Sequence, residues 1–267
     1  MARKFVLIDA NNWFRRYMYS DRFLSVDGMI AELDAAKPDF LIWDGYNGNA
    51  RRRAIFPDYK KARKERDIDT DFETLNMIRN DLMPYLPCAS FWADGYEGDD
   101  LMNHTARLLA LADKDNEIEI VSTDKDLAAI LPGYPHLKNP LVSEKFIQTV
   151  GDRKWIPLYK TLVGDPSDGI PGLKGFGPKA WDSLSAWTRD KLCEVFSLGT
   201  SDVLTAVEPE EKALSKIQEH FSELKPMWDI VCFFPIEPTA VKCCPAEYNP
   251  KKIREILDVK GTFYDRR

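Results

Sequence analysis

Acidic side chains follow three short apolar segments of the sequence. The segments are Phe5–Ile8, Phe40–Trp43 and Ile118–Val121. The carboxylates that follow them belong to Asp9, Asp44, Asp124 and Asp126. Apolar runs of this length predict buried strands, and strands that alternate with helical segments indicate a parallel sheet. The carboxyl ends of parallel strands lie at one edge of the sheet, where ligands bind. We therefore expect these four carboxylates to gather at that edge.

Five more acidic residues stand where helices or turns are expected to begin. They are Glu97, Asp99, Asp100, Asp165 and Asp168. The first three precede a predicted helix over Leu101–Ala112, and the last two would share a face on a first helical turn. Each acid alone suits a helix N-cap, but capping does not explain why every predicted strand ends in acid. Grouped carboxylates need cations among them, and oxygen ligands without His or Cys favour Mg²⁺ or Mn²⁺.

A run of positive charge lies between the second predicted strand and the acidic helix. Residues 51–66 hold eight Lys or Arg side chains against only Asp58 and Glu65. Phe56 and Tyr59 stand among these cations, and aromatic side chains between cations suit stacking on unpaired bases. A solvated helix face is the alternative, but the strongly one-signed charge favours contact with nucleic acid.

A glycine-rich stretch follows the last two acids. Gly172, Gly175 and Gly177 predict a tight turn between two helices, and Pro178 suits the first position of the second helix. Glycines let a backbone approach phosphate closely, and a helix N-terminus offers free N–H groups. With Lys179 close behind, the stretch favours a helix-hairpin-helix that grips DNA backbone without reading its sequence. An ordinary loop between helices is the alternative.

Composition limits the class of protein. The chain has 267 residues, 44% of them hydrophobic, and a net charge of −6, which is typical of an ordered soluble protein. No apolar run approaches the ~20 residues that cross a bilayer, and the first apolar stretch is too short for a signal peptide. Five scattered cysteines suit a reducing compartment, so we expect a cytoplasmic protein.

Six motifs occur in an order that resembles the 5′-nuclease superfamily. They are Ile8-Asp9-Ala10-Asn11-Asn12, Trp43-Asp44-Gly45, Pro57-Asp58-Tyr59-Lys60-Lys61-Ala62-Arg63, Glu97-Gly98-Asp99-Asp100, Ser122-Thr123-Asp124-Lys125-Asp126-Leu127 and Gly164-Asp165-Pro166-Ser167-Asp168-Gly169-Ile170-Pro171-Gly172. The superfamily contains flap endonucleases, the 5′→3′ exonuclease domain of bacterial DNA polymerase I, and bacteriophage 5′→3′ exonucleases. The small chain resembles the stand-alone phage enzymes most, which would place it in the host cytoplasm.

The resemblance implies an α/β fold. A PIN-like parallel sheet flanked by helices, with a helical arch, would be followed by a smaller all-α helix-hairpin-helix (H3TH) domain. The implied boundaries are 1–155 for the catalytic domain, with the arch at about 45–87, then 156–235 for the DNA-gripping domain and 236–267 for a C-terminal extension.

The resemblance also assigns roles to residues. The implied metal ligands are Asp9, Asp44, Glu97, Asp99, Asp100, Asp124, Asp126, Asp165 and Asp168. The implied catalytic residues are Lys60, Arg63, Asp124 and Asp126. The DNA-contacting residues, drawn from the resemblance, the basic run and the glycine turn together, are Arg16, Arg51, Arg52, Arg53, Tyr59, Lys60, Arg63, Gly172, Lys174, Gly175, Gly177 and Lys179. Two Mg²⁺ or Mn²⁺ ions are implied, and K⁺ at Gly172–Gly177.

These expectations describe a monomeric two-metal phosphodiesterase. Its substrate would be DNA, or an RNA–DNA hybrid, with a free 5′ end, cut near the junction of duplex and single strand in replication, primer removal or DNA degradation. Two alternatives remain: a DNA-binding scaffold that has lost catalysis, and a PIN-type ribonuclease that acts on single-stranded RNA. The nine acids argue against the first, and the glycine turn argues against the second.

Overall fold

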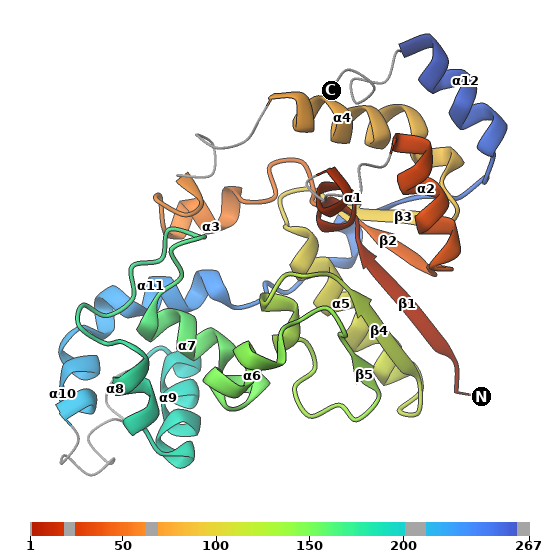
Figure 1. The fold of residues 1–267 in the computed structure, drawn as a ribbon. Coiled ribbons are helices and arrows are strands. Elements are labelled where there is room, and N and C mark those ends of the chain that lie inside the picture. Colours follow the sequence, from red (N-terminus) through yellow and green to blue (C-terminus); the bar gives the residue numbers. More distant parts are fainter. Residues whose placement is uncertain (1, 19–24, 62–68, 201–211, 261–267) are drawn as a thin grey trace.

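A six-stranded sheet organises one of two regions of the protein. The structure is a computed structural model that describes residues 2–18, 25–61, 69–200 and 212–260 (Figure 1). The strands are β1 (Lys4–Asp9), β2 (Phe40–Ile42), β3 (Ala89–Ala93), β4 (Glu117–Val121), β5 (Leu137–Lys138) and β6 (Val241–Cys244). Their order across the sheet is β5-β4-β1-β2-β3-β6, and every neighbouring pair is parallel except β3 and β6.

The three strands predicted from apolar runs are confirmed as β1, β2 and β4. Ile8 lies level with Leu41 on β2 and with Val121 on β4, so the three carboxyl ends reach the same edge. The last strand, β6, comes from the segment that we expected to be a C-terminal extension. It pairs antiparallel with β3 and therefore completes the sheet rather than extending away from it.

Helices cover both faces of the sheet. In this part of the chain they are α1 (Ala10–Met18), α2 (Val26–Ala35), α3 (Ala50–Ile55), α4 (Asp69–Met77), α5 (Gly98–Ala112) and α12 (Pro250–Lys260). Successive strand residues point to opposite faces. Ile8 and Leu41 pack with α1, α2 and α12 in one core, whereas Leu7 and Ile42 pack with α5 in the other. A π-helical turn over Ile78–Leu82 and a 3-10 turn over Met83–Tyr85 continue α4 toward β3.

A second, helical region has its own core. Its helices are α6 (Glu144–Val150), α7 (Ile156–Val163), α8 (Pro178–Ser183), α9 (Ala186–Leu198), α10 (Lys212–Glu219) and α11 (Phe221–Val231). Shorter 3-10 turns lie at Asp126–Ala129, Arg153–Trp155 and Pro238–Ala240. The fully buried Trp181 and Phe196 anchor the core, and Phe196 stacks on Trp228 with ring centroids 5.4 Å apart. Pro178 opens α8 as predicted.

The cysteines and the described helices bear on two further expectations from the sequence. All five cysteines are free thiols. Among the described helices, none is long and apolar enough to cross a membrane.

A buried ion pair joins the two regions. The Arg52 guanidinium on α3 donates to both carboxylate oxygens of Asp100 on α5, at 2.7 and 2.8 Å. Its Nε also donates to the carbonyl of Ile230, at the end of α11, over 2.8 Å. The backbone N–H of Phe234 donates to the same carboxylate. With 3% and 0% of their surfaces exposed, Arg52 and Asp100 hold α3, α5 and the chain that returns to β6 in fixed positions.

We expect Arg52→Met to lower the free energy of unfolding by about 3–5 kcal/mol, because it leaves the Asp100 charge buried without a partner. Arg51→Met is the matched control. Arg51 is exposed and its guanidinium lies 4.2 Å from the centroid of the Tyr96 ring, so its loss should cost about 0.5–1 kcal/mol. Urea unfolding of both variants makes the comparison.

The double variant Arg52→Met/Asp100→Asn should recover part of the loss, because the uncompensated charge is removed with its partner. If it is as unstable as the sum of the two single variants, the ion pair is not what holds these segments together.

Candidate functional site

Three carboxylates meet at the carboxyl edge of the sheet. Asp99 in the first turn of α5, and Asp124 and Asp126 in the loop after β4, each offer an oxygen within 4.8 Å of the others'. We call these three residues the first acidic group. The loop is held locally, since the N–H of Asp126 donates to the Asp124 carboxylate at 3.0 Å and the N–H of Asp124 donates to the Ser122 hydroxyl at 3.1 Å. Of the four acids expected together at this edge, Asp124 and Asp126 belong to the group, and Asp99 joins them.

Burial and repulsion act on the charges of the first acidic group and of the neighbouring Asp9. Burial raises the pKa of Asp9, at the end of β1, to about 7, and the charges of Asp44 and Asp124 add to the rise. Burial, followed by the charges of Asp124 and Asp9, raises the pKa of Asp99 well above its ordinary value. Burial also raises the pKa of Asp126 to about 6. Carboxylates in this state are stabilised by whatever positive charge reaches them, whether protons or metal ions.

Asp9 and Asp44 are fixed by their own hydrogen bonds. Asp9 accepts from the Ser122 hydroxyl at 2.8 Å and from the N–H of Asn12 at 3.0 Å. Asp44 accepts from the N–H of Gly98 at 2.6 Å and from the Asn11 amide at 2.7 Å. A Cβ on Gly98 would lie 3.2 Å from an Asp44 oxygen, so the glycine lets α5 begin against this carboxylate.

A second acidic group, which we define as Asp126, Asp165 and Asp168, surrounds a lysine. The Lys160 ammonium on α7 lies 2.6 Å from Asp165 and 3.7 Å from Asp168, and it also pairs with Asp126. Burial would raise the pKa of Asp165, but the nearby Lys160 charge outweighs it and lowers that pKa to about 2. Asp126 belongs to both groups and joins them.

We expected Asp165 and Asp168 to lie on the first turn of a helix, but they do not. They lie in a tight turn that is closed by paired backbone hydrogen bonds between Asp165 and Ile170, at 2.8 and 2.9 Å. Gly164 precedes the turn with φ of 95°, a conformation that favours glycine. The reversal directs both carboxylates back toward Lys160 at the preceding helix.

Lys160 was not among the residues singled out from the sequence. The signal was present, because it is the only charged residue in the apolar segment Ile156–Val163 and precedes Asp165 by five positions. An isolated charge in a helix that is otherwise buried requires a partner.

Glu97 is held by cations rather than by the first acidic group. Its Oε1 pairs with the Lys60 ammonium at 2.8 Å, and its Oε2 accepts from the Tyr59 hydroxyl at 2.9 Å and lies 3.2 Å from Arg52. Burial would raise the pKa of Glu97, but Lys60 and Arg52 lower it below its ordinary value. The carboxylate is therefore ionised and engaged within the protein.

Three sequence-based assignments are corrected by burial. Asp100 was expected to bind metal, but it is fully buried and holds Arg52 and the Phe234 N–H. Arg52 was expected to contact DNA and is committed to that ion pair instead. Tyr59 was expected to stack on bases, but 3% of its surface is exposed and its hydroxyl donates to Glu97. Side chains committed inside the protein cannot reach DNA.

The remaining basic side chains of the prediction lie nearer the surface. Arg51 is exposed, and Arg53 donates to the carbonyl of Tyr59 at 3.2 Å. The Arg16 guanidinium lies over the Trp13 ring at 4.9 Å from its centroid. Arg63 lies outside the described residues.

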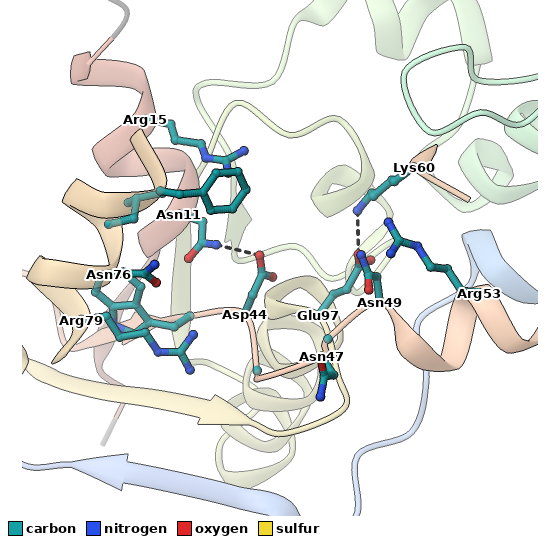
Figure 2. A pocket seen from close by; sticks show the side chains of 15 residues that line it. Asn11, Arg15, Asp44, Asn47, Asn49, Arg53, Lys60, Asn76, Arg79 and Glu97 are labelled. Carbon is teal, nitrogen blue, oxygen red and sulfur yellow. Dashed lines mark hydrogen bonds and ion pairs between the residues drawn. The ribbon is translucent and has the colours of Figure 1, made fainter. Parts of the chain in front are cut away.

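A polar cavity of about 460 Å³ opens beside Asp44 and Glu97. In Figure 2, Arg15, Asn76 and Arg79 lie on one side of it, Arg53 and Lys60 lie on the other, and the two carboxylates lie between them. The Arg79 guanidinium lies 4.4 Å from the centroid of the Tyr46 ring. Sequence analysis missed Arg15 and Arg79, since no charge run marks them and only the fold brings them together.

The glycine turn lies on the surface of the helical region. Leu173 and Phe176 are buried and anchor it, whereas Lys174 and Lys179 are exposed. Gly172 has φ of 69°, and a Cβ there would approach the backbone of Gly164 to 2.6 Å. The Lys216 ammonium on α10 donates to the carbonyl of Lys174.

Comparison with known proteins identifies the family. Residues 4–151, more than half of the chain, match the family described as 5'-3' exonuclease, N-terminal resolvase-like domain. The chain belongs to this 5′-3′ exonuclease family. The superfamily implied by the six sequence motifs is thereby confirmed.

Named relatives of this exonuclease-family chain include DNA polymerases I, flap endonucleases and a 5'-3' exonuclease of Aquifex aeolicus. It is 29% identical over 218 residues to DNA polymerase I of Thermus aquaticus, covering 76% of the chain and 22% of that relative. It is 27% identical over 255 residues to DNA polymerase I of Caldicellulosiruptor bescii, covering 87% and 28%. Flap endonuclease Xni of Shewanella piezotolerans is 28% identical over 204 residues, covering 66% and 74%. The chain thus spans about a quarter of the polymerases that it matches.

Solved structures share the fold. A bacteriophage T5 5′-exonuclease with bound zinc has a TM-score of 0.63 at 16% identity, with 86% of this chain and 89% of that chain covered. A bacteriophage T5 flap endonuclease, in a pseudo-enzyme–product complex with DNA and metal ions, has a TM-score of 0.62 with the same identity and coverage. The expected mixed α/β fold is confirmed.

We expect metal-free protein to lose stability as pH rises from about 4 to about 7. The Asp9 pKa of about 7 lies above its unfolded value, so in this window the native state holds a proton that the unfolded state releases. Rising pH removes that proton and favours unfolding. Thermal melts in EDTA at both ends of the window should show a smaller loss for Asp9→Asn than for the parent.

The exposed Asp115 provides a control, since Asp115→Asn should lose as much thermal stability between the two pH values as the parent does. If the parent and Asp9→Asn lose the same thermal stability between the two pH values, Asp9 is charged at both ends of the window, which contradicts its raised pKa.

Proposed function

We propose that the chain is a metal-dependent 5′ nuclease that hydrolyses phosphodiester bonds of DNA near a free 5′ end. The observation that carries this is the first acidic group, with three carboxylates within reach of one cation at the carboxyl edge of the sheet, beside a cavity lined by basic side chains. Carboxylates suit cations, and the basic lining suits the polyanion that is to be cut. Relatives named as a 5′-3′ exonuclease and as flap endonucleases support the same activity.

The residues present fit a hard divalent ion. The first acidic group offers oxygen ligands without His or Cys, and burial with mutual repulsion makes it favour positive charge. Mg²⁺ or Mn²⁺ prefers such ligands. When bound, the ion supplies Lewis-acid activation of water and stabilises the leaving oxygen. Asp99 and Asp124 would hold it, with Asp9 and Asp44 supporting from β1 and β2.

Lys60 is the basic residue placed to act on the reacting phosphate. Its ammonium is held 2.8 Å from Glu97, and its backbone N–H donates to the carbonyl of Asp168 at 2.8 Å, so it lies between Glu97 and the turn that carries Asp168. A cation fixed there offsets charge that develops on the phosphate during cleavage. Lys60 has φ of 52°, an unusual conformation for a residue other than glycine, and the surrounding structure maintains it.

The polar cavity is suited to the single-stranded 5′ end. Arg15, Arg53 and Arg79 can neutralise phosphates, while asparagine side chains and the exposed Phe72 offer hydrogen bonds and a stacking surface. Residues 45–87 would form the arch over this cavity.

The helical region, residues 156–235, would hold the duplex. The exposed Lys174 and Lys179 flank a glycine turn followed by the N-terminus of α8, and this arrangement suits contact with DNA backbone. Carbonyls of Gly172–Gly177 are the place where K⁺ would bind. The chain would act as a monomer on duplex, flap or RNA–DNA hybrid substrates in the cytoplasm, or in the host cytoplasm for a phage protein.

Cleavage assays with Mg²⁺ test the function directly. Matched substrates with a 5′ flap, a blunt duplex, an RNA–DNA hybrid and single-stranded RNA distinguish the alternatives. Cleavage near the 5′ end of DNA, lost in EDTA and in Asp124→Asn, is the expected result. Cutting of RNA alone would indicate a PIN-type ribonuclease, and DNA binding without cleavage would indicate a scaffold.

Two lysines should separate catalysis from binding. Lys60→Ala should remove about 2.7–4 kcal/mol of transition-state stabilisation and so lower kcat, because the cation acts mainly in the transition state. The affinity for DNA should change little. Lys179→Ala should mainly weaken binding and lower the salt dependence by about one phosphate contact. Single-turnover rates and DNA titrations at several salt concentrations measure both.

The exposed Lys114 lies on the turn before β4 and serves as a control, since Lys114→Ala should change neither quantity. If Lys60→Ala and Lys179→Ala lower affinity and turnover alike, the proposed division between the two regions is wrong.

A further inference from the structure

Lys160 lies in surroundings that few lysines occupy. Only 6% of its surface is exposed, and its ammonium pairs with all three carboxylates of the second acidic group, at 2.6 Å from Asp165 and 3.7 Å from Asp168. A buried ammonium persists only where several negative charges compensate its loss of water. The position that these carboxylates could offer to a metal ion is therefore already taken by a side-chain cation.

Local chain geometry fixes this arrangement. α7 carries Lys160 and ends at Val163, and the turn closed by the Asp165–Ile170 backbone pair follows directly. A Cβ on Gly172 would approach the Val163 carbonyl carbon to 2.6 Å, so the next segment packs tightly against the end of the helix. The lysine and two of its partners thus belong to one short, closely packed stretch of chain.

The two acidic groups differ in charge. Lys160 brings one positive charge to the three carboxylates of the second group. Glu97 and Asp100 are neutralised separately by Lys60 and Arg52. The hydrogen bonds of Asp124 and Asp9 given above come from neutral groups, and Asp99 and Asp124 offer oxygens within 4.8 Å of each other. A divalent ion therefore competes with the Lys160 ammonium at the second acidic group. At Asp99 and Asp124 of the first group, less of the negative charge is balanced by side-chain cations.

We propose that Lys160 is a tethered cation of the second acidic group that competes with a second divalent ion. The protein without DNA then binds one ion tightly, at Asp99 and Asp124, and a second one much more weakly. A charge within ~4–6 Å changes the stability of a charged state by about tenfold to a thousandfold, and the second ion is weakened by a factor in that range. This inference rests on the proposed metal-dependent function and states how many divalent ions the protein without DNA binds tightly.

Mn²⁺ titration of the full chain without DNA, followed by the electron paramagnetic resonance signal of the free ion, counts the bound ions independently of activity. The parent should bind one ion tightly. Lys160→Met, which keeps the apolar stem and removes the charge, should bind a second ion at least about tenfold more tightly than the parent does. Lys154→Met is the matched control, because Lys154 pairs with Asp190 at 2.7 Å, is partly exposed and does not contact either acidic group.

Two further variants sharpen the result. Lys160→Arg keeps the charge and should keep the ion count of the parent. Lys160→Met/Asp165→Asn should lose the ion that Lys160→Met gains, which would locate that ion at the second acidic group.

Thermal melts keep the test decisive if Lys160→Met is unstable without metal. Removing the ammonium leaves three carboxylates uncompensated, so the variant should melt lower in EDTA and gain more from Mn²⁺ than the parent does. Two equally tight ions in the parent, or an unchanged second ion and an equal gain in Lys160→Met, would overturn the inference. A parent that binds no ion tightly would instead contradict the proposed function.

Discussion

Carboxylates that crowd at the edge of a sheet can stay together only where positive charge lies among them. This chain meets that constraint in three ways. Arg52 neutralises Asp100 in the interior, Lys60 neutralises Glu97 at the margin of the cavity, and Lys160 lies among the carboxylates of the second acidic group. In the first acidic group, Asp99 and Asp126 keep raised pKa values, so a cation from solution is stabilised most at this group.

The same constraint couples the site to the fold. Asp100 and Asp99 are neighbours in the first turn of α5, yet successive helix residues point in different directions. Asp100 turns inward to Arg52 and to the N–H of Phe234, whereas Asp99 faces the carboxylates that follow β4. The ion pair that secures α5 thereby fixes the position of a proposed metal ligand. A structural acid and a proposed metal ligand stand side by side because one orients the other.

Sequence patterns predicted what depends on neighbouring residues in the chain. The apolar runs located β1, β2 and β4, and the acids that follow them predicted the gathering at the sheet edge. The same patterns could not show which charges are buried. The run Arg51–Arg53 appears uniform, but α3 directs Arg52 into the interior and leaves Arg51 exposed. Likewise, β6 and the cavity that contains Arg15 and Arg79 depend on contacts between distant segments, which periodicity does not encode.

Fixed and exchangeable cations suit different tasks. A side-chain ammonium or guanidinium is tied to the backbone, so it holds acids in register but cannot leave when a phosphate arrives. A solvent ion binds through several oxygens and can accept one from the substrate. The chain places its own cations where the acids support the structure, and it leaves Asp99 and Asp124 of the first acidic group to an ion from the solvent. Asp44, which borders the cavity, accepts a hydrogen bond from Gly98 in the turn that carries Asp99, so the first acidic group is linked to the proposed path of the DNA. Charge compensation therefore separates the acids that build this edge of the sheet from those available for the proposed catalysis.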